Sequence, residues 1–383
     1  MNRSNYLLLL LLVTLSFFGC SNDDNSDEPS GGIYLEVTPE DIGDGLVVDL
    51  ADNVGMNIVR LESLETAIRT KEYTNIHSVL VAKNNKLVYE SYYPGSTVFE
   101  EYFEWDRNMP HNIHSATKSV TSAIVGIALE QEGLTIDEKI FKHFPEFNIP
   151  TDDPRMNVSV GDVLSMSSGI QWDEWSVPYE NPNNNHQQMY DSGNWVEFVA
   201  NQPVTTDPGS LFTYNSGLSI LLGAFVTKLT GESVGGFTSK HLFQPMKIFD
   251  NQINWFIGPN SAFQTGGGLQ MTPRGMMKFG LLFLNEGNWN GNQLISSEWV
   301  RNSTSQKGAN PGYAYHWWLT SYDTVKGTIN GFLAAGRGGQ YVIVIDELDL
   351  VVVFTGGNDN ALASSQPREI MTKFILPSIL VQQ

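Results

Sequence analysis

The stretch HSATKSVTSAIVGIALEQ, residues 114–131, carries the strongest structural signal in this chain of 383 residues. Its apolar side chains recur every three or four positions, which is the spacing of one face of a helix. They are Val120, Ala123, Ile124, Ile127 and Ala128. The stretch therefore predicts an amphipathic helix that begins near His114.

Ser115 and Lys118 fall in the first turn of this helix and, being three residues apart, share a face. Free backbone N–H groups at that end of a helix favour a developing negative charge. A serine hydroxyl becomes a good nucleophile only when a base takes its proton. Lys118 can be that base only if burial lowers the pKa of its ammonium group from about 10.4 toward neutrality. The alternative is a helix-capping serine followed by a solvated lysine.

A second segment, PGSLFTYNSG at 208–217, combines turn residues with the start of an apolar helix. Tyr214 and Ser216 would therefore lie on a constrained loop. From there the Tyr214 hydroxyl can relay a proton to a leaving group. The alternative role of Tyr214 is that of an aromatic anchor at a helix start.

A third segment, AAGRGGQ at 334–340, leads into an apolar strand. Glycines at a strand edge let another backbone or a ligand approach closely. We expect Gly336, Arg337 and Gly338 to contribute to a substrate or oxyanion site, together with the backbone N–H of Ser115. The alternative is a β-bulge or tight turn, with the Arg337 side chain directed into solvent.

Paired apolar runs near the two ends of the chain predict two hairpins. Residues 78–82 and 86–90 flank Asn84-Asn85, which is a two-residue turn signal. Residues 341–345 and 350–354 flank a short acidic turn. Strands at both ends of the chain suggest one sheet assembled from the two termini.

The middle of the chain is expected to be helical. Thr272-Pro273 supplies an N-cap and a first-turn proline before the apolar run at 276–284, and residues 217–229 form another apolar helix. The predicted fold class is α/β (α+β), with a central antiparallel sheet built from N- and C-terminal strands and flanked by helices. A mainly helical subdomain is inserted between the strands.

Composition excludes several classes of function. Lys and Arg total 22 against 42 Asp and Glu, which gives a formal net charge of −20 and argues against a nucleic-acid partner. The single Cys excludes an internal disulfide and any multi-thiolate metal site. The seven His residues show no metal-ligand spacing, so we expect neither a metal nor another cofactor. The Gly-x-Ser-x-Gly, His-Glu-x-x-His and phosphate-loop motifs are absent.

Aromatic residues cluster in three stretches, at 103–105, 172–175 and 317–318. We expect these side chains to belong mainly to the core. The alternative is a pocket lining that prefers apolar acyl or aryl groups.

The three segments, in this order, resemble the serine hydrolases of the β-lactamase-like superfamily, in particular class C-type esterases, D-amino-acid peptidases and nylon-oligomer hydrolases. The resemblance rests on Ser115-x-x-Lys118, Tyr214-x-Ser216 and the glycine-rich strand, and it extends from about Ile33 to the C-terminus. It implies a β-lactamase/transpeptidase-like fold.

The resemblance also implies roles for individual residues. Ser115 would attack a carbonyl and form an acyl-enzyme, Lys118 would activate it, and Tyr214 would shuttle the proton. Ser216 stands where relatives often have Asn, and we expect it to contribute to the substrate or oxyanion site. Ala334-Ala335 stands where relatives usually have a Lys or His that holds a substrate carboxylate, so strong β-lactamase activity is not expected.

The N-terminus has the pattern of an export signal. Arg3 precedes the apolar run at 7–13, and Gly19-Cys20 resembles a bacterial lipobox, in which the cleaved chain carries acyl groups on its Cys. The predicted organisation is a signal peptide at 1–19, a lipidated Cys20 with an acidic tether at 20–32, and a hydrolase domain at 33–383. The alternative is an ordinary signal peptide with a chance Cys.

The sequence therefore predicts a serine hydrolase acting on small-molecule esters or linear amides outside the cytoplasm. Its expected location is a bacterial cell envelope, anchored to the membrane by lipid. Two alternatives stay open. One is a D,D-carboxypeptidase-like peptidoglycan enzyme, and the other is a non-catalytic binding protein that retains the fold. The oligomeric state is not predicted.

Overall fold

The computed structural model describes residues 38–97, 102–358 and 365–380. These residues belong to the second of two units in the chain, Glu36–Gln383, and the first unit is Met1–Leu35. The predicted signal segment, Cys20 and the tether lie outside the described residues. Within the described part, no helix is both long and apolar enough to cross a membrane.

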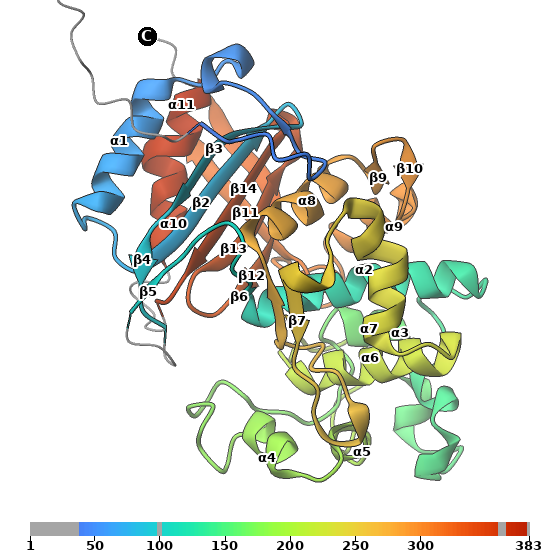
Figure 1. Cartoon of the computed structure of the whole chain (residues 1–383). Coiled ribbons are helices and arrows are strands. Elements are labelled where there is room, and N and C mark those ends of the chain that lie inside the picture. Colours follow the sequence, from blue (N-terminus) through green and yellow to red (C-terminus); the bar gives the residue numbers. More distant parts are fainter. Residues whose placement is uncertain (1–37, 98–101, 359–364, 381–383) are drawn as a thin grey trace, which may run out of the picture. The chain divides into compact units, whose positions relative to one another are not determined.

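A seven-stranded sheet forms the centre of the unit, in the order β1-β3-β2-β14-β13-β12-β11 (Figure 1). Every neighbouring pair is antiparallel except β1 with β3. The strands are β1 (Val47–Val48), β2 (Ile76–Lys83), β3 (Lys86–Tyr92), β11 (Trp318–Thr324), β12 (Gly327–Gly336), β13 (Gln340–Ile345) and β14 (Leu350–Gly356). Pairing of β14 with β2 joins the two ends of the chain, which confirms the predicted fold class.

Both predicted hairpins are present. The turn between β2 and β3 consists of Asn84 and Asn85, whose φ angles are 53° and 61°. Two successive left-handed residues match the twist of a hairpin, and Asn tolerates that conformation. Between β13 and β14, a 3-10 turn at Asp346–Leu348 occupies the acidic segment.

Strand β14 is buried on both faces, which explains its unbroken apolar sequence. Helix α8 (Pro273–Leu284) packs on one face, where a Cβ at Gly280 would lie 2.5 Å from the side chain of Val351. Helices α1 (Ile58–Arg69), α10 (Gln366–Ile370) and α11 (Leu376–Leu380) lie on the other side of the sheet (Figure 1). Helix α8 begins as predicted, since the Thr272 side chain accepts from Gly275 N.

The helical region follows β3 in sequence. The predicted helix at 114–131 consists of a 3-10 turn, His114–Ala116, followed by α2 (Thr117–Gln131), and the predicted helix at 217–229 is α6 (Ser216–Thr230). Shorter helices complete the region. They are α3 (Val160–Leu164), α4 (Asn185–Asp191), α5 (Trp195–Ala200), α7 (Val234–Thr238) and α9 (Ser297–Ser303).

Candidate active site

Ser115 lies in the 3-10 turn between a short strand and α2. That strand, β6 (His111–Asn112), pairs with β8 (Leu269–Met271), which in turn pairs with β7 (Ile253–Trp255). The Ile113 N–H extends the pairing by donating to the Leu269 carbonyl at 3.0 Å. The small sheet thus fixes the chain immediately before Ser115, and the Ser115 side chain faces a cavity of about 430 Å³.

Lys118 projects from the first turn of α2 and is buried, with 2% of the residue exposed. Its Nζ donates to three oxygens. They are Gly266 O at 2.6 Å, Ser216 Oγ at 3.0 Å and Ser115 Oγ at 3.3 Å. The face of the Tyr214 ring lies 4.8 Å from the same atom. Helical spacing therefore places Ser115 and Lys118 together, and distant parts of the chain enclose the amine. Tyr214 lies on the predicted loop, but Ser216 does not, because the N-cap Asn215 starts α6 and makes Ser216 its first residue.

A buried carboxylate sets the direction of this hydrogen-bond network. Ser216 donates its backbone N–H to Glu174 Oε2 at 2.7 Å and its hydroxyl to Glu174 Oε1 at 2.8 Å. The Trp172 indole and the Tyr179 hydroxyl also donate to this carboxylate, at 2.6 Å and 3.0 Å. Because the single Ser216 proton is directed at Glu174, the Ser216 oxygen is left to accept from Lys118.

Ser216 is held in place because it is the first residue of α6. Asn215 is the N-cap, and its side chain accepts from Leu218 N at 3.1 Å. Tyr214 precedes this cap, is 7% exposed and stacks on Trp175 with ring centroids 4.7 Å apart. Ser216 is one of the described residues that line the cavity, whereas Tyr214 is not. The contact of Tyr214 with Lys118 is made by the face of its ring.

The glycine-rich segment approaches the nucleophile from the sheet. Gly336 ends β12, and a Cβ at that position would lie 2.1 Å from the carbonyl oxygen of Ile113. Only glycine permits such an approach between β12 and the chain that leads to Ser115. Arg337 follows and lines the cavity. Gly338, with φ of 84°, lines a neighbouring cavity instead.

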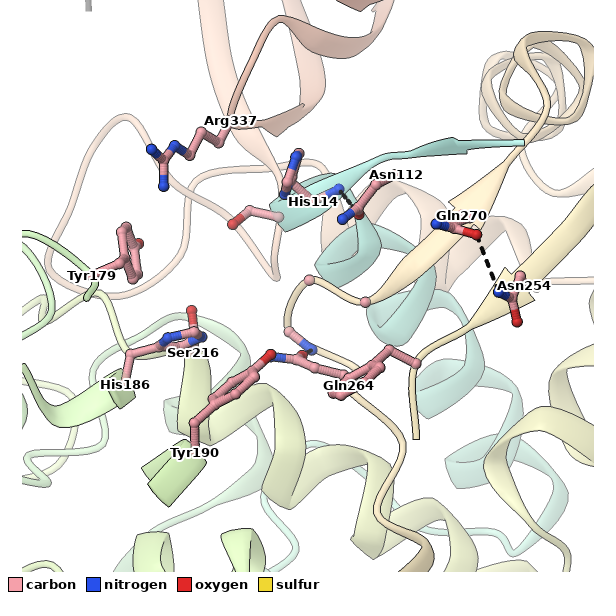
Figure 2. Close-up of a pocket in the computed structure, with 15 residues that line it drawn as sticks. Asn112, His114, Tyr179, His186, Tyr190, Ser216, Asn254, Gln264, Gln270 and Arg337 are labelled. Atoms are coloured by element: carbon pink, nitrogen blue, oxygen red, sulfur yellow. Dashed lines mark hydrogen bonds between the residues drawn. The ribbon is translucent and has the colours of Figure 1, made fainter. Parts of the chain in front are cut away.

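Neutral polar and aromatic groups form most of the cavity wall. Figure 2 shows Arg337 and Tyr179 on one side of the cavity and Asn254 and Gln270 on the opposite side. The guanidinium of Arg337 lies 3.8 Å from the exposed carboxylate of Glu180.

Two histidines also line this cavity. Burial, aided by the positive charge of Arg337, lowers the pKa of His114 to about 4. Burial likewise lowers the pKa of His186 to about 4, and the nearby Glu174 partly opposes this effect. Both are neutral at pH 7, so Arg337 is the one described lining residue with a formal charge.

Two functional groups of the site, the Glu174 carboxylate and the Gly266 carbonyl, were not predicted from the sequence. Glu174 lies in the aromatic stretch at 172–175, and its acidic side chain between two tryptophans is the only available signal. The Gly266 carbonyl has none, because a backbone oxygen is common to every residue. In the structure the Gln264 side chain accepts from Gly266 N at 2.8 Å and so fixes that turn.

The described residues contain no group of three or more His, Cys, Asp or Glu that could hold a metal ion.

One histidine near Lys118 is fixed by hydrogen bonds. His316 Nδ1 donates to the Leu164 carbonyl at 2.9 Å, so its Nε2 accepts from Ser219 at 3.0 Å. Burial lowers the pKa of His316 to about 3, and the charge of Lys118 acts in the same direction.

Solved structures of hydrolases superpose on this chain and share its fold. A putative 6-aminohexanoate-dimer hydrolase from Bacillus anthracis superposes with a TM-score of 0.65 at 19% identity, covering 83% of this chain and 82% of that chain. A family VIII carboxylesterase superposes with a TM-score of 0.61 at 16% identity, covering 83% of this chain and 95% of that one.

Sequence relatives carry related names. The 6-aminohexanoate-dimer hydrolase of Paenarthrobacter ureafaciens is 23% identical, over 77% of each chain. A putative D-alanyl-D-alanine carboxypeptidase of Escherichia coli K12 is 24% identical over 53% of this chain. The match to this carboxypeptidase spans only 49% of the relative's own length.

The fold, together with the names of its relatives, defines a class of serine hydrolases whose members are named as esterases, amidases and carboxypeptidases. A model of the Beta-lactamase family matches residues 72–368. This chain belongs to the Beta-lactamase family, which confirms the superfamily predicted from the three motifs.

Proposed function

We propose that this protein is a serine hydrolase that cleaves esters or linear amides through an acyl-enzyme on Ser115. The observation that carries the proposal is the arrangement around Lys118 Nζ. Gly266 O can only accept, and Ser216 Oγ is left to accept because its proton points at Glu174. A neutral lysine has two N–H bonds and one lone pair, so these two acceptors take both N–H bonds. In this neutral form the lone pair faces Ser115 Oγ, in place of the third N–H bond that donates to Oγ when Lys118 is an ammonium group.

The proposed reaction follows from this arrangement. Lys118 takes the Ser115 proton as Oγ bonds to the substrate carbonyl carbon, and the carbonyl electrons move to its oxygen. Backbone N–H groups of Ser115 and of the segment after β12 hold that oxyanion. The oxyanion electrons then return to the carbonyl, the bond to the leaving group breaks, and the Lys118 ammonium, which lies beside the Tyr214 ring, gives its proton to the leaving group. Water attacks the acyl-enzyme carbonyl in the same way: Lys118 takes a proton from water and returns it to Ser115 Oγ as the bond between Oγ and the acyl group breaks.

Glu174 is a positioning residue in this scheme. It does not line the cavity, but it accepts the hydrogen bond from the Ser216 hydroxyl and so leaves a lone pair of Ser216 Oγ to face Lys118. The non-catalytic alternative depended on a solvent-exposed Lys118, and an exposure of 2% argues against it.

The short side chains of Ala334 and Ala335 favour esters and linear amides over β-lactams. A cation at their place in β12 would hold the carboxylate of a β-lactam. The described cavity has Arg337 as its one charged lining residue, and that residue pairs loosely with Glu180.

Arg337 supports a second candidate function, the trimming of peptides that end in a free carboxylate. Its guanidinium can fork onto such a group. On this proposal, Arg337→Ala lowers kcat/KM for a carboxylate-bearing muropeptide about tenfold and leaves an uncharged aryl ester almost unaffected. Equal effects on both substrates would exclude Arg337 from carboxylate binding.

We also propose that the protein acts in the cell envelope, anchored through a lipid on Cys20. The support is the sequence pattern around Gly19-Cys20 alone. Two acyl chains anchor far more firmly than one, so Cys20→Ser should move the protein from the membrane fraction to the soluble fraction after a carbonate wash. Continued membrane retention of the variant would contradict the lipid anchor.

A fluorophosphonate probe tests the proposed nucleophile directly. The wild-type protein should be labelled on the peptide that contains Ser115, and Ser115→Ala should prevent labelling. Labelling of a different serine in the wild-type protein would overturn the assignment.

A further inference from the structure

A second cavity, of about 560 Å³, lies beside the cavity that holds Ser115. The two cavities share a wall formed by Asn112, His114 and Gln270. His114 immediately precedes the proposed nucleophile. On the sheet side, Arg337 lines the first cavity and its neighbour Gly338 lines the second. Both cavities therefore adjoin the segments that would hold the reacting carbonyl.

One wall of the second cavity is apolar. It consists of Phe103, Trp105, Met109 and Pro110. The Trp105 ring stacks on His77 with centroids 4.9 Å apart and an interplanar angle of 14°, and it lies 4.4 Å from the ring of His111. The two histidines are joined to each other by a hydrogen bond of 2.8 Å, so both rings that support Trp105 are themselves paired.

The second cavity also carries no formal charge at neutral pH. Its described lining has no Asp, Glu, Lys or Arg. Burial lowers the pKa of His111 and of His114 to about 4, so both rings are neutral. In a chain with a net charge of −20, an uncharged cavity with an aromatic wall suits a neutral apolar group.

We propose that this cavity is a substrate subsite for an uncharged aromatic or alicyclic group attached to the ester or amide that is cleaved at Ser115. The inference rests on the proposed function and narrows its substrate class. The first cavity, which Ser115 and Arg337 line, then holds the scissile group and the remainder of the substrate. A volume of 560 Å³ lies within the usual range of small-molecule sites.

Three neutral esters test the subsite by kinetics. Methyl acetate is the reference, benzyl acetate adds a ring on the alcohol side, and methyl 3-phenylpropanoate adds a ring on the acyl side. We expect wild-type kcat/KM, measured by acid release, to be about tenfold higher for one of the ring-bearing esters. Phe103→Ala and Met109→Ala should each remove most of that preference while methyl acetate turnover changes little.

A matched control is Phe249→Ala. Phe249 is 53% exposed, compared with 38% for Phe103, and lines neither cavity. This control should keep the wild-type preference. An active wild-type enzyme without a ring preference would overturn the subsite, as would a preference that Phe103→Ala and Met109→Ala leave unchanged.

A binding measurement separates failure of the subsite from failure of the proposed function. Ser115→Ala should bind benzyl alcohol or 3-phenylpropanamide by calorimetry, and adding Phe103→Ala should weaken that affinity about fivefold or more. This measurement needs no turnover. If the wild-type protein hydrolyses no ester, the proposed hydrolase function is wrong. If Ser115→Ala binds neither compound, or binds them with an affinity that Phe103→Ala does not change, the subsite is wrong.

Discussion

Replacing Ser115 by Ala is the smallest substitution that should abolish activity without disturbing the fold. Ser115→Ala removes one oxygen from a 3-10 turn that backbone contacts already fix. We expect ester hydrolysis to fall at least a thousandfold, a magnitude typical for loss of a nucleophile, and the melting temperature to stay within a few degrees of wild type. A folded variant that retains more than a tenth of the wild-type rate would refute the assignment.

Glu174 should control the protonation behaviour of the site. In Glu174→Gln, the amide can donate to Ser216 and so reverse the hydrogen bond that leaves the Ser216 oxygen free to accept. We expect kcat to fall about tenfold or more and the pH profile of kcat/KM to shift. Both effects should be largely absent when Ser216→Ala is already present, because Glu174 acts through Ser216.

Glu65 provides the matched control for this variant. It is also a buried carboxylate, 1% exposed, which accepts from the hydroxyls of Tyr89 and Tyr93 and pairs with Arg69. None of these residues lines either cavity. Glu65→Gln should lower stability and leave the pH profile unchanged. If Glu174→Gln also leaves the pH profile unchanged, Glu174 has only a structural role.

At the scale of elements, the contact between the end of β12 and the chain before α2 decides where the reacting groups lie. In Gly336→Ala, the added Cβ would meet the Ile113 carbonyl, so the strand or the nucleophile turn must move. We expect a loss of about 1 to 3 kcal/mol in stability, together with a clear loss of hydrolysis.

Gly193→Ala is the control, since a Cβ there meets nothing within 4 Å. It should change neither the melting temperature nor the rate. If Gly336→Ala were as stable and as active as Gly193→Ala, the close approach of β12 would be unimportant for the site.

At the scale of the molecule, neutral histidines that are buried or half-buried should make the protein sensitive to acid. Their pKa values are lowered mainly by burial, to about 3 for two of them and about 4 for the other three. They are His77 and His316, and His111, His114 and His186. The unfolded chain takes up these protons near pH 6.5, whereas the folded chain excludes them.

Stability should therefore be full above pH 6.5 and fall as the pH is lowered toward about 3. Each histidine contributes roughly 1.4 kcal/mol per pH unit within its window. Acidification also reduces the net negative charge, which acts in the opposite direction by easing repulsion. A melting temperature that falls between pH 7 and pH 5 would show that the histidines dominate, and a constant or rising one would contradict the prediction.

The sequence by itself determined the local elements and the family. The period of the segment at 114–131 fixed a helix with Ser115 and Lys118 on one face, because three residues span almost one turn. Asn84-Asn85 specified a hairpin through its left-handed backbone, and two apolar hairpins at the chain ends predicted the sheet. Each of these signals is local, so neighbouring residues are sufficient to read it.

Only the tertiary structure decided how Lys118 is surrounded. Ser216 and Glu174 lie 42 residues apart in sequence, and Lys118 and Gly266 lie 148 apart. A backbone carbonyl has no signature in the sequence, and a carboxylate reveals its partner only when the chain is folded. The orientation of the Tyr214 ring and the shared wall of the two cavities likewise depend on packing between distant segments, which no local pattern encodes.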